Sequence, residues 1–280
     1  MNVPGRWLDR LTTWRKISLN TWGVPNNATI YGQLEIDVGP LQSYLKEQSE
    51  QHQVKCTLTH AVTRSLAILL RRYPDCNVLV RGRRIWMRDQ VDIFHQVAMP
   101  IDEGKGHADL SGAVVRRADE KQIHEIARDL GDQALAVREK RDGQMAKTRS
   151  MLFGMPAPLM RWTLKTIGWL NYRLNLALPG TPRDSFGGAM VTAVGMLGIK
   201  LAYVPLVTFS RCPIIVLVGQ VEDRAVVRDG QIVARPMCTL TATLDHRVID
   251  GFMAGLLARD MKRLLEEPQL LGQAATPGAA

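Results

Sequence analysis

Several stretches of the chain alternate apolar and polar residues in the manner of β-strands. Residues 30–38 alternate as a half-buried strand does, and residues 91–101 place most of their apolar side chains on one face. The continuous apolar run at 214–218 predicts a fully buried strand. The pair 229–230, Asp-Gly, is a tight-turn signal, and the alternation at 238–244 predicts that a long strand follows it.

Helices are indicated where the apolar period lengthens to three or four residues. Apolar residues between 62 and 73 follow this spacing, and Pro74 is expected to end that helix. The same spacing recurs on a charged segment at 123–137 and again at 253–265. Helices and strands mix without strict alternation, so the sequence predicts the α/β class with a mixed central sheet.

The composition is that of a folded protein with a sizeable core. Of 280 residues, 46% are hydrophobic and 22% charged, which excludes disordered and collagen-like classes and fits one large or two smaller domains. No run reaches the ~18 uncharged apolar residues of a spanning helix. The four cysteines form no CxxC pair, which argues against a zinc ribbon or a disulfide framework and favours a cytoplasmic location.

The net charge of +9 comes from 36 basic against 27 acidic residues, spread along the chain. Residues 81–84 form the densest basic cluster, which lies between two strand-like segments and is interpreted as a turn. No nucleic-acid-binding motif is present, so we expect no nucleic-acid partner. A basic protein also attracts polyanionic cofactors or an anionic membrane surface. Neither GxGxxG, GxxxxGK[ST] nor HExxH occurs, and no metal site is predicted.

Residues 147–183 differ from the rest of the chain. Between 150 and 180 they are rich in Met, Trp and Leu, with three cations and no acid. Prolines are expected to break the segment into short helices. Three interpretations stay open: a helical hairpin packed on the protein or a neighbouring subunit, a roof over an acyl-chain tunnel, or an amphipathic segment on a membrane. Of these we favour the tunnel, and hence a substrate with an apolar chain of medium or long length.

Candidate chemistry is concentrated in the segment 245–251, DHRVIDG, where a strand ends and a helix begins. His246 stands at the strand edge and can act as a general base near neutral pH if a local acceptor fixes its tautomer. Asp250 follows four residues later, and Gly251 permits a sharp exit. The structural alternative is that Asp250 caps the helix and His246 is an ordinary surface residue.

Two other histidines are assigned structural places. His95 lies on the apolar face of its strand and is expected to be a packed core residue, with a channel lining as the alternative. His60 is expected in the capping region of its helix.

The heptapeptide, with 235–244 before it, resembles the catalytic domain of the dihydrolipoamide acyltransferases of 2-oxo acid dehydrogenase complexes. It is also similar to chloramphenicol acetyltransferase, which shares that fold. Further similar segments occur in family order at 14–16, 34–38, 187–188, 191–200 and 226–236. The resemblance covers roughly residues 13–267, with a departure between about 141 and 185. It implies a two-layer sandwich like that of chloramphenicol acetyltransferase.

The resemblance also implies roles for individual residues. His246 matches the general base that removes a proton from an acceptor thiol or hydroxyl. Asp250 matches the aspartate that holds the site together, and Arg15 matches the arginine that pairs with it. Thr192 stands where the family places the hydroxyl that donates to the tetrahedral oxyanion, and Gly251 supports the site.

The family's site lies between subunits of a trimer, so the resemblance implies a homotrimer or a multiple of trimers, with coenzyme A entering as acyl-CoA. The domain expectation is a catalytic domain at 1–267, containing the apolar helical insertion at about 147–183, and a flexible tail at 268–280.

Two departures from the family bear on the acceptor. The resemblance begins within about fifteen residues of the first residue, so we expect no covalent lipoyl group on this chain. Ala193 stands where the family has an asparagine. The acceptor therefore stays open between a lipoyl thiol, a carrier protein and a small molecule. The alternative to an enzyme is a non-catalytic oligomeric or membrane-associated scaffold that retains the fold.

Overall fold

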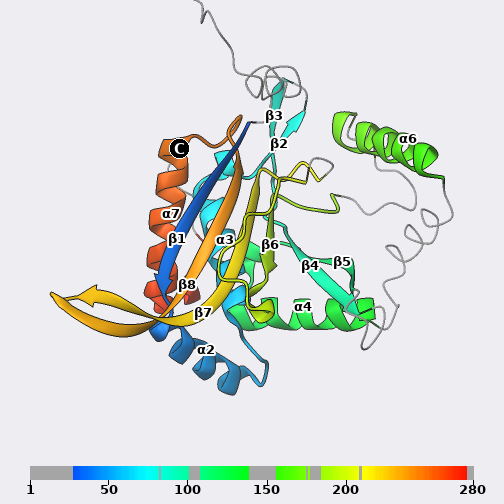
Figure 1. Cartoon of the computed structure of the whole chain (residues 1–280). Coiled ribbons are helices and arrows are strands. Elements are labelled where there is room, and N and C mark those ends of the chain that lie inside the picture. The colour runs from blue at the N-terminus through cyan, green and yellow to red at the C-terminus, as the bar shows by residue number, and fades with distance from the viewer. Residues whose placement is uncertain are drawn as a thin grey trace, which may run out of the picture.

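The computed structural model describes residues 28–81, 83–100, 108–138, 156–174, 176, 184–207 and 210–275 (Figure 1). Within them, the central sheet has six strands in the order β1-β8-β7-β6-β4-β5. β6 pairs parallel with both β4 and β7, and the other neighbours pair antiparallel, so the predicted mixed α/β sheet is confirmed. The strands are β1 (Thr29–Asp37), β4 (Ile93–Pro100), β5 (Ala108–Val115), β6 (Ala189–Ala193), β7 (Ile214–Arg228) and β8 (Gln231–Asp245).

Helices cover one face of this sheet. They are α2 (Gly39–His52), α3 (Leu58–Arg72), α4 (Ile123–Arg138) and α7 (Gly251–Glu266). α3 is the central helix: residues 61–70 are all buried, and Leu66 and Leu69 pack with Val216 of β7 and Leu257 of α7 in one core cluster. Pro74 follows the C-cap of α3, as predicted. Two short strands, β2 (Val78–Arg81) and β3 (Arg84–Met87), form a separate hairpin.

An extended segment, 199–207, covers part of the opposite face. The Thr241 hydroxyl donates a hydrogen bond to the carbonyl of Ala202 at 2.6 Å. The Tyr203 hydroxyl donates to the side-chain oxygen of Gln33 at 3.1 Å. Helices on one side and this segment on the other complete the layers around the sheet.

The longest hairpin is formed by β7 and β8. Asp229 and Gly230 both have positive φ, 51° and 77°, and join the paired residues Arg228 and Gln231 in the predicted two-residue turn. A register shift between Val218 and Val221 divides the hairpin. Beyond it most residues of both strands are partly or fully exposed, and Figure 1 shows the ribbon extending away from the body.

The prediction of a flexible tail from residue 268 is wrong for residues 268–272. Residues Pro268–Gly272 form a short 3-10 helix, η5, and Leu271 is completely buried. The guanidinium of Arg64 holds this segment by donating to the carbonyls of Leu271 and Gln273 at 3.1 and 2.7 Å. Residues 276–280 lie outside the described part.

His60 and His95 both have structural places. His60 is the third helical residue of α3, and its Nδ1 accepts a hydrogen bond from the backbone N–H of Thr57 at 3.1 Å, which forms a capping box. His95 on β4 is buried against Thr63 of α3. The predictions of a capping residue and a packed core residue are therefore confirmed.

The insertion at 147–183 is described from residue 156 to 174 and at 176. It contains helix α6 (Ala157–Gly168), continued by one π-helical turn, η3 (Trp169–Arg173). Helical structure is as expected, but Pro158 does not break it, because it stands in the first turn, where no intrahelical N–H bond is lost. Remaining short 3-10 turns are η1 (Pro74–Cys76), η2 (Ala118–Glu120) and η4 (Gly195–Leu197).

Candidate active site

His246 is held in place directly after the last residue of β8. Its backbone N–H donates to the carbonyl of Ala28, beside the start of β1, at 2.6 Å. Its imidazole Nδ1 lies 2.9 Å from the carbonyl oxygen of Ile249. Because a carbonyl only accepts, Nδ1 carries the proton and Nε2 keeps the lone pair of the neutral ring. The side chain is exposed, so this basic nitrogen is accessible from outside.

An ion pair fixes the turn on which His246 stands. The Asp245 carboxylate accepts from Arg247 Nε at 2.9 Å and from the Arg247 backbone N–H at 3.1 Å. Burial raises the pKa of Asp245, but its hydrogen bonds and charge contact with Arg247 outweigh this, so the net pKa is lowered and the carboxylate stays ionised. Ile249, completely buried, anchors the other side of the turn. The imidazole therefore projects from a rigid loop.

Asp250 is the N-cap of α7, because its Oδ1 accepts from the backbone N–H of Met253 at 2.8 Å. Gly251 is the first residue of that helix. A Cβ there would meet no atom within 4 Å and its φ is not positive, so the exit from the turn does not require glycine. The pairing of Asp250 with Arg15 falls on a residue outside the described part of the chain.

Thr192 is half-buried on β6, on the sheet face away from α3 and α7. It stands opposite Leu217 of β7, which in turn stands opposite Thr241 of β8, two strands away. His246 lies five residues after Thr241, just beyond the end of β8. At ~3.3 Å per residue and ~4.8 Å per strand, the two positions are about 19 Å apart in one chain. A single subunit does not bring Thr192 and His246 together.

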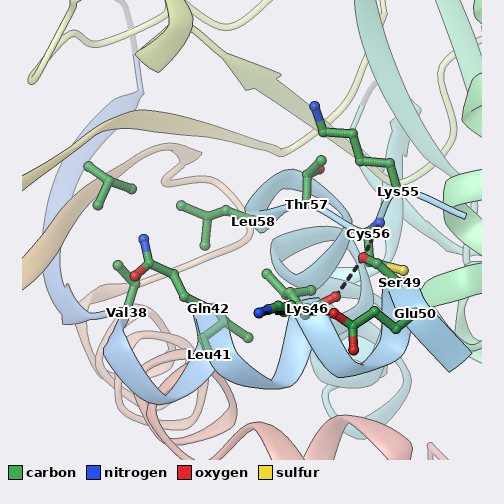
Figure 2. A pocket seen from close by; sticks show the side chains of 12 residues that line it. Val38, Leu41, Gln42, Lys46, Ser49, Glu50, Lys55, Cys56, Thr57 and Leu58 are labelled. Carbon is green, nitrogen blue, oxygen red and sulfur yellow. Dashed lines mark hydrogen bonds and ion pairs between the residues drawn. The ribbon is translucent and has the colours of Figure 1, made fainter.

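The described residues also form a groove of about 500 Å³ far from His246 (Figure 2). One side of α2, from residue 41 to residue 50, and the segment 55–58 line it, with Val38 and Val221. Val38 lies at the opposite end of β1 from Ala28, about 30 Å along the strand. The walls of the groove are mostly apolar, with Lys46, Glu50 and Lys55 among the lining residues, and no histidine lines it.

The described residues contain neither a metal-binding cluster nor a membrane-spanning helix. Among these residues, no three His, Cys, Asp or Glu side chains gather in a way that could hold a metal ion. None of the described helices combines the length and apolar character that crossing a bilayer demands.

Sequence reasoning missed two parts of this site. The carbonyl of Ile249, which fixes the His246 tautomer, is a backbone group that no motif reveals. The clamp between Asp245 and Arg247 could have been found, because an acid and an arginine two residues apart flank the histidine directly.

The chain matches the model of the 2-oxoacid dehydrogenases acyltransferase (catalytic domain) over residues 24–146 and 181–273. It therefore belongs to this family of acyltransferase catalytic domains. The unmatched gap coincides with the predicted insertion. The match starts later than the expected residue 13, so Arg15 lies outside it.

Among relatives is the dihydrolipoyllysine-residue acetyltransferase component of the pyruvate dehydrogenase complex of Bacillus subtilis (strain 168), 28% identical over 243 residues, 85% of this chain and 44% of the relative. The same component from Staphylococcus epidermidis (strain ATCC 35984) is 27% identical over 244 residues, 85% of this chain and 45% of the relative. The chain thus spans less than half the length of these relatives.

Solved structures show the same fold. The cubic core of a pyruvate dehydrogenase multienzyme complex aligns with a TM-score of 0.65 at 20% identity, covering 88% of this chain and 84% of the other. A probable dihydrolipoamide acetyltransferase from Listeria monocytogenes aligns with a TM-score of 0.61 at 20% identity, covering 94% and 95%. The expected acyltransferase sandwich is confirmed.

Proposed function

We propose that this chain is an acyltransferase that moves an acyl group between coenzyme A and a thiol or hydroxyl acceptor, with His246 as the general base. The observation that carries the proposal is the 2.9 Å contact between His246 Nδ1 and the Ile249 carbonyl, in a chain of this family. In the neutral ring this contact leaves Nε2 with the free lone pair that a base requires, on a side chain that is exposed.

The proposed reaction is a direct transfer. Nε2 of His246 takes the acceptor's proton, and the resulting nucleophile attacks the thioester carbonyl carbon. Thr192 donates its hydroxyl hydrogen bond to the oxyanion of the tetrahedral intermediate. The carbon–sulfur bond to coenzyme A then breaks, and the departing thiolate takes the proton from the imidazolium. Coenzyme A is thus a substrate.

The distance of about 19 Å between the two positions supports a site shared between subunits. His246 of one copy would meet Thr192 of another. Shortly after Thr192, in the turn η4, large apolar side chains are exposed, including Met196 at 88% and Leu197 at 70%. Such a surface fits a second copy of the chain. We propose a homotrimer or a multiple of trimers, an assembly type that the family resemblance implies.

We propose that three residues, Asp250, Arg15 and Gly251, support the general base His246. The Oδ1 atom of Asp250 serves the helix cap, and we propose that Oδ2 meets Arg15. One carboxylate would then join the start of α7 to the N-terminal segment. The family resemblance also implies a supporting role for Gly251, although within one chain a Cβ at this position would meet no atom within 4 Å.

The acceptor is a thiol or a hydroxyl. The relatives' name, dihydrolipoyllysine-residue acetyltransferase, favours a dihydrolipoyl thiol. We propose that this chain carries no lipoyl group itself, so such an acceptor would come from another protein. We propose a cytoplasmic location, which fits four cysteines that are all free and buried. Burial raises the pKa of the thiols of Cys76, Cys212 and Cys238, which keeps these thiols protonated and unreactive.

The rigid, tautomer-fixed His246 favours an enzyme over a scaffold, which has no use for such a group. The test incubates the purified chain with acetyl-CoA and dihydrolipoamide and follows acetyl-dihydrolipoamide by chromatography, because total thiol stays constant in this transfer. His246→Ala should lower the rate about 10²- to 10⁴-fold. His52→Ala, a histidine change on α2, should not. Equal rates for His246→Ala and the unchanged chain would favour the scaffold.

A further inference from the structure

Helix α6 and the start of η3 present an apolar stripe to the outside. Leu159, Trp162 and Trp169 are 54%, 71% and 53% exposed, and Thr166 is exposed as well. Their spacing of three, four and three residues places all four on one side of a helix. We call residues 159, 162, 166 and 169 the α6 stripe.

The η3 end of this segment is attached to the rest of the protein. The backbone carbonyl of Tyr172 in η3 accepts from Arg81 Nε of β2 at 3.0 Å. Burial raises the pKa of the Tyr172 hydroxyl to about 12, in keeping with a packed ring. Figure 1 shows α6 beyond the β2–β3 hairpin, away from the central sheet. The segment is therefore anchored at η3, while the side chains of the α6 stripe stay exposed.

The sequence that contains the stripe carries charge of one sign. Residues 143–183 contain no acid, and their cations are Lys147, Arg149, Arg161, Lys165, Arg173 and Arg183. At 100° per residue, position 165 stands about 40° around the helix from position 169, and position 161 about 80° from it on the same flank of the stripe. Tryptophans beside cations are the composition of helices that lie in a membrane interface.

We propose that the α6 stripe docks this protein on an anionic lipid surface. α6 has 12 residues and is about 18 Å long, shorter than the ~30 Å of bilayer hydrocarbon, so it would lie flat with its stripe in the headgroup region. The matched family model omits residues 147–180, so the docking belongs to this chain and not to the contacts that the family shares.

Charge and exposure favour lipid over two other partners. A second copy of the α6 stripe would bring positions 161 and 165 against identical cations, with no acid in the segment to pair with them. An acyl-chain tunnel needs enclosed walls, whereas Trp162 is 71% exposed. Anionic headgroups satisfy the cations and take up the indole rings together.

The test is sedimentation of the full chain with vesicles of phosphatidylcholine alone or with 30% phosphatidylserine. We expect binding to the anionic vesicles that weakens in 0.5 M NaCl. Trp162→Ala with Trp169→Ala should weaken it at least about tenfold, since two large apolar contacts are lost. Val227→Ala with Ile232→Ala, at the β7–β8 tip and 69% and 78% exposed, is the matched control and should bind normally.

Fluorescence identifies the residues that enter the lipid. Brominated phosphatidylcholine in the anionic vesicles should quench tryptophan emission in the unchanged chain, and Trp162→Phe with Trp169→Phe should lose most of this quenching. Acyl transfer in solution should be unchanged in all these variants, so a failed transfer assay leaves the vesicle result intact.

Several results would overturn the proposal. One is equal vesicle binding by the double-alanine variant and the unchanged chain. Another is no vesicle binding at all. If the double-alanine variant instead lowers the oligomer mass, a second copy covers the stripe. If it abolishes a preference for octanoyl- over acetyl-CoA without any vesicle binding, the stripe serves the substrate.

Discussion

The hydroxyl of Thr63 and Nε2 of His95 lie 3.1 Å apart in the core between α3 and β4. The same hydroxyl donates its proton to the carbonyl of Thr59 at 2.7 Å. It can therefore only accept from His95, so Nε2 carries a proton in the neutral ring. Burial lowers the pKa of His95 to about 3 and that of His60 to about 4.

The lowered pKa values of His60 and His95 predict that the folded protein loses stability in mild acid, starting at a pH above that at which most carboxylates titrate. Their folded pKa values lie below the unfolded value of ~6.5, so the folded chain binds fewer protons in that interval. The free energy of unfolding should fall as pH drops from 6.5 towards 4, by about 1.4 kcal/mol per pH unit for each histidine. Urea denaturation at pH 7, 6 and 5 measures this. His60→Gln should reduce the slope, and a stability independent of pH over this interval would refute the assignment.

Asp250 should have two separable roles. Asp250→Ala removes the N-cap of α7 and should cost about 1 kcal/mol, seen as a lower melting temperature, together with lost acyl transfer. Asp250→Asn keeps a capping oxygen but no charge, so it should melt near the wild type and still transfer poorly if the carboxylate pairs with Arg15. A wild-type melting temperature for Asp250→Ala would contradict the cap.

Complementation tests the shared site. His246→Ala and Thr192→Ala chains, unfolded and refolded together, should form hybrid trimers in which some sites combine an intact His246 with an intact Thr192. Activity should then return to the mixture. The control is each variant refolded alone, which should stay inactive. Hybrids confirmed by mass but without activity would indicate a site within one chain, or a different hydroxyl.

Arg64 should be a major stabilising residue. It is 1% exposed and donates to three carbonyls, those of Asp119, Leu271 and Gln273. Arg64→Met should cost about 3 kcal/mol or more, because these acceptors lose their donor. Arg128→Met removes one exposed bond to the carbonyl of His52 and is the matched control, with an expected cost of about 0.5 kcal/mol. Similar denaturation midpoints for both variants would disprove this role.

Most of the regular elements were predictable, because apolar spacing indicates their type and local signals mark their ends: α3 ends before Pro74, and β7 turns into β8 at Asp229. The sequence also located His246, because strand, turn and helix signals meet in one heptapeptide. The docking of η5 was not predictable, since it depends on Arg64, some 200 residues away, reaching its carbonyls. Likewise the separation of Thr192 from His246 depends on strand register, which no single segment contains.

The register shift between Val218 and Val221 has a consequence for hydrogen exchange. Before it, β7 is paired on both sides, with β6 and with β8; after it, the strand pairs with β8 alone, and β8 has no β1 neighbour before Met237. A two-stranded ribbon is marginally stable in water. Its amide protons can exchange by local fraying, while those of 214–218 exchange only when the whole sheet opens. One continuous strand thus contains two classes of amide protection.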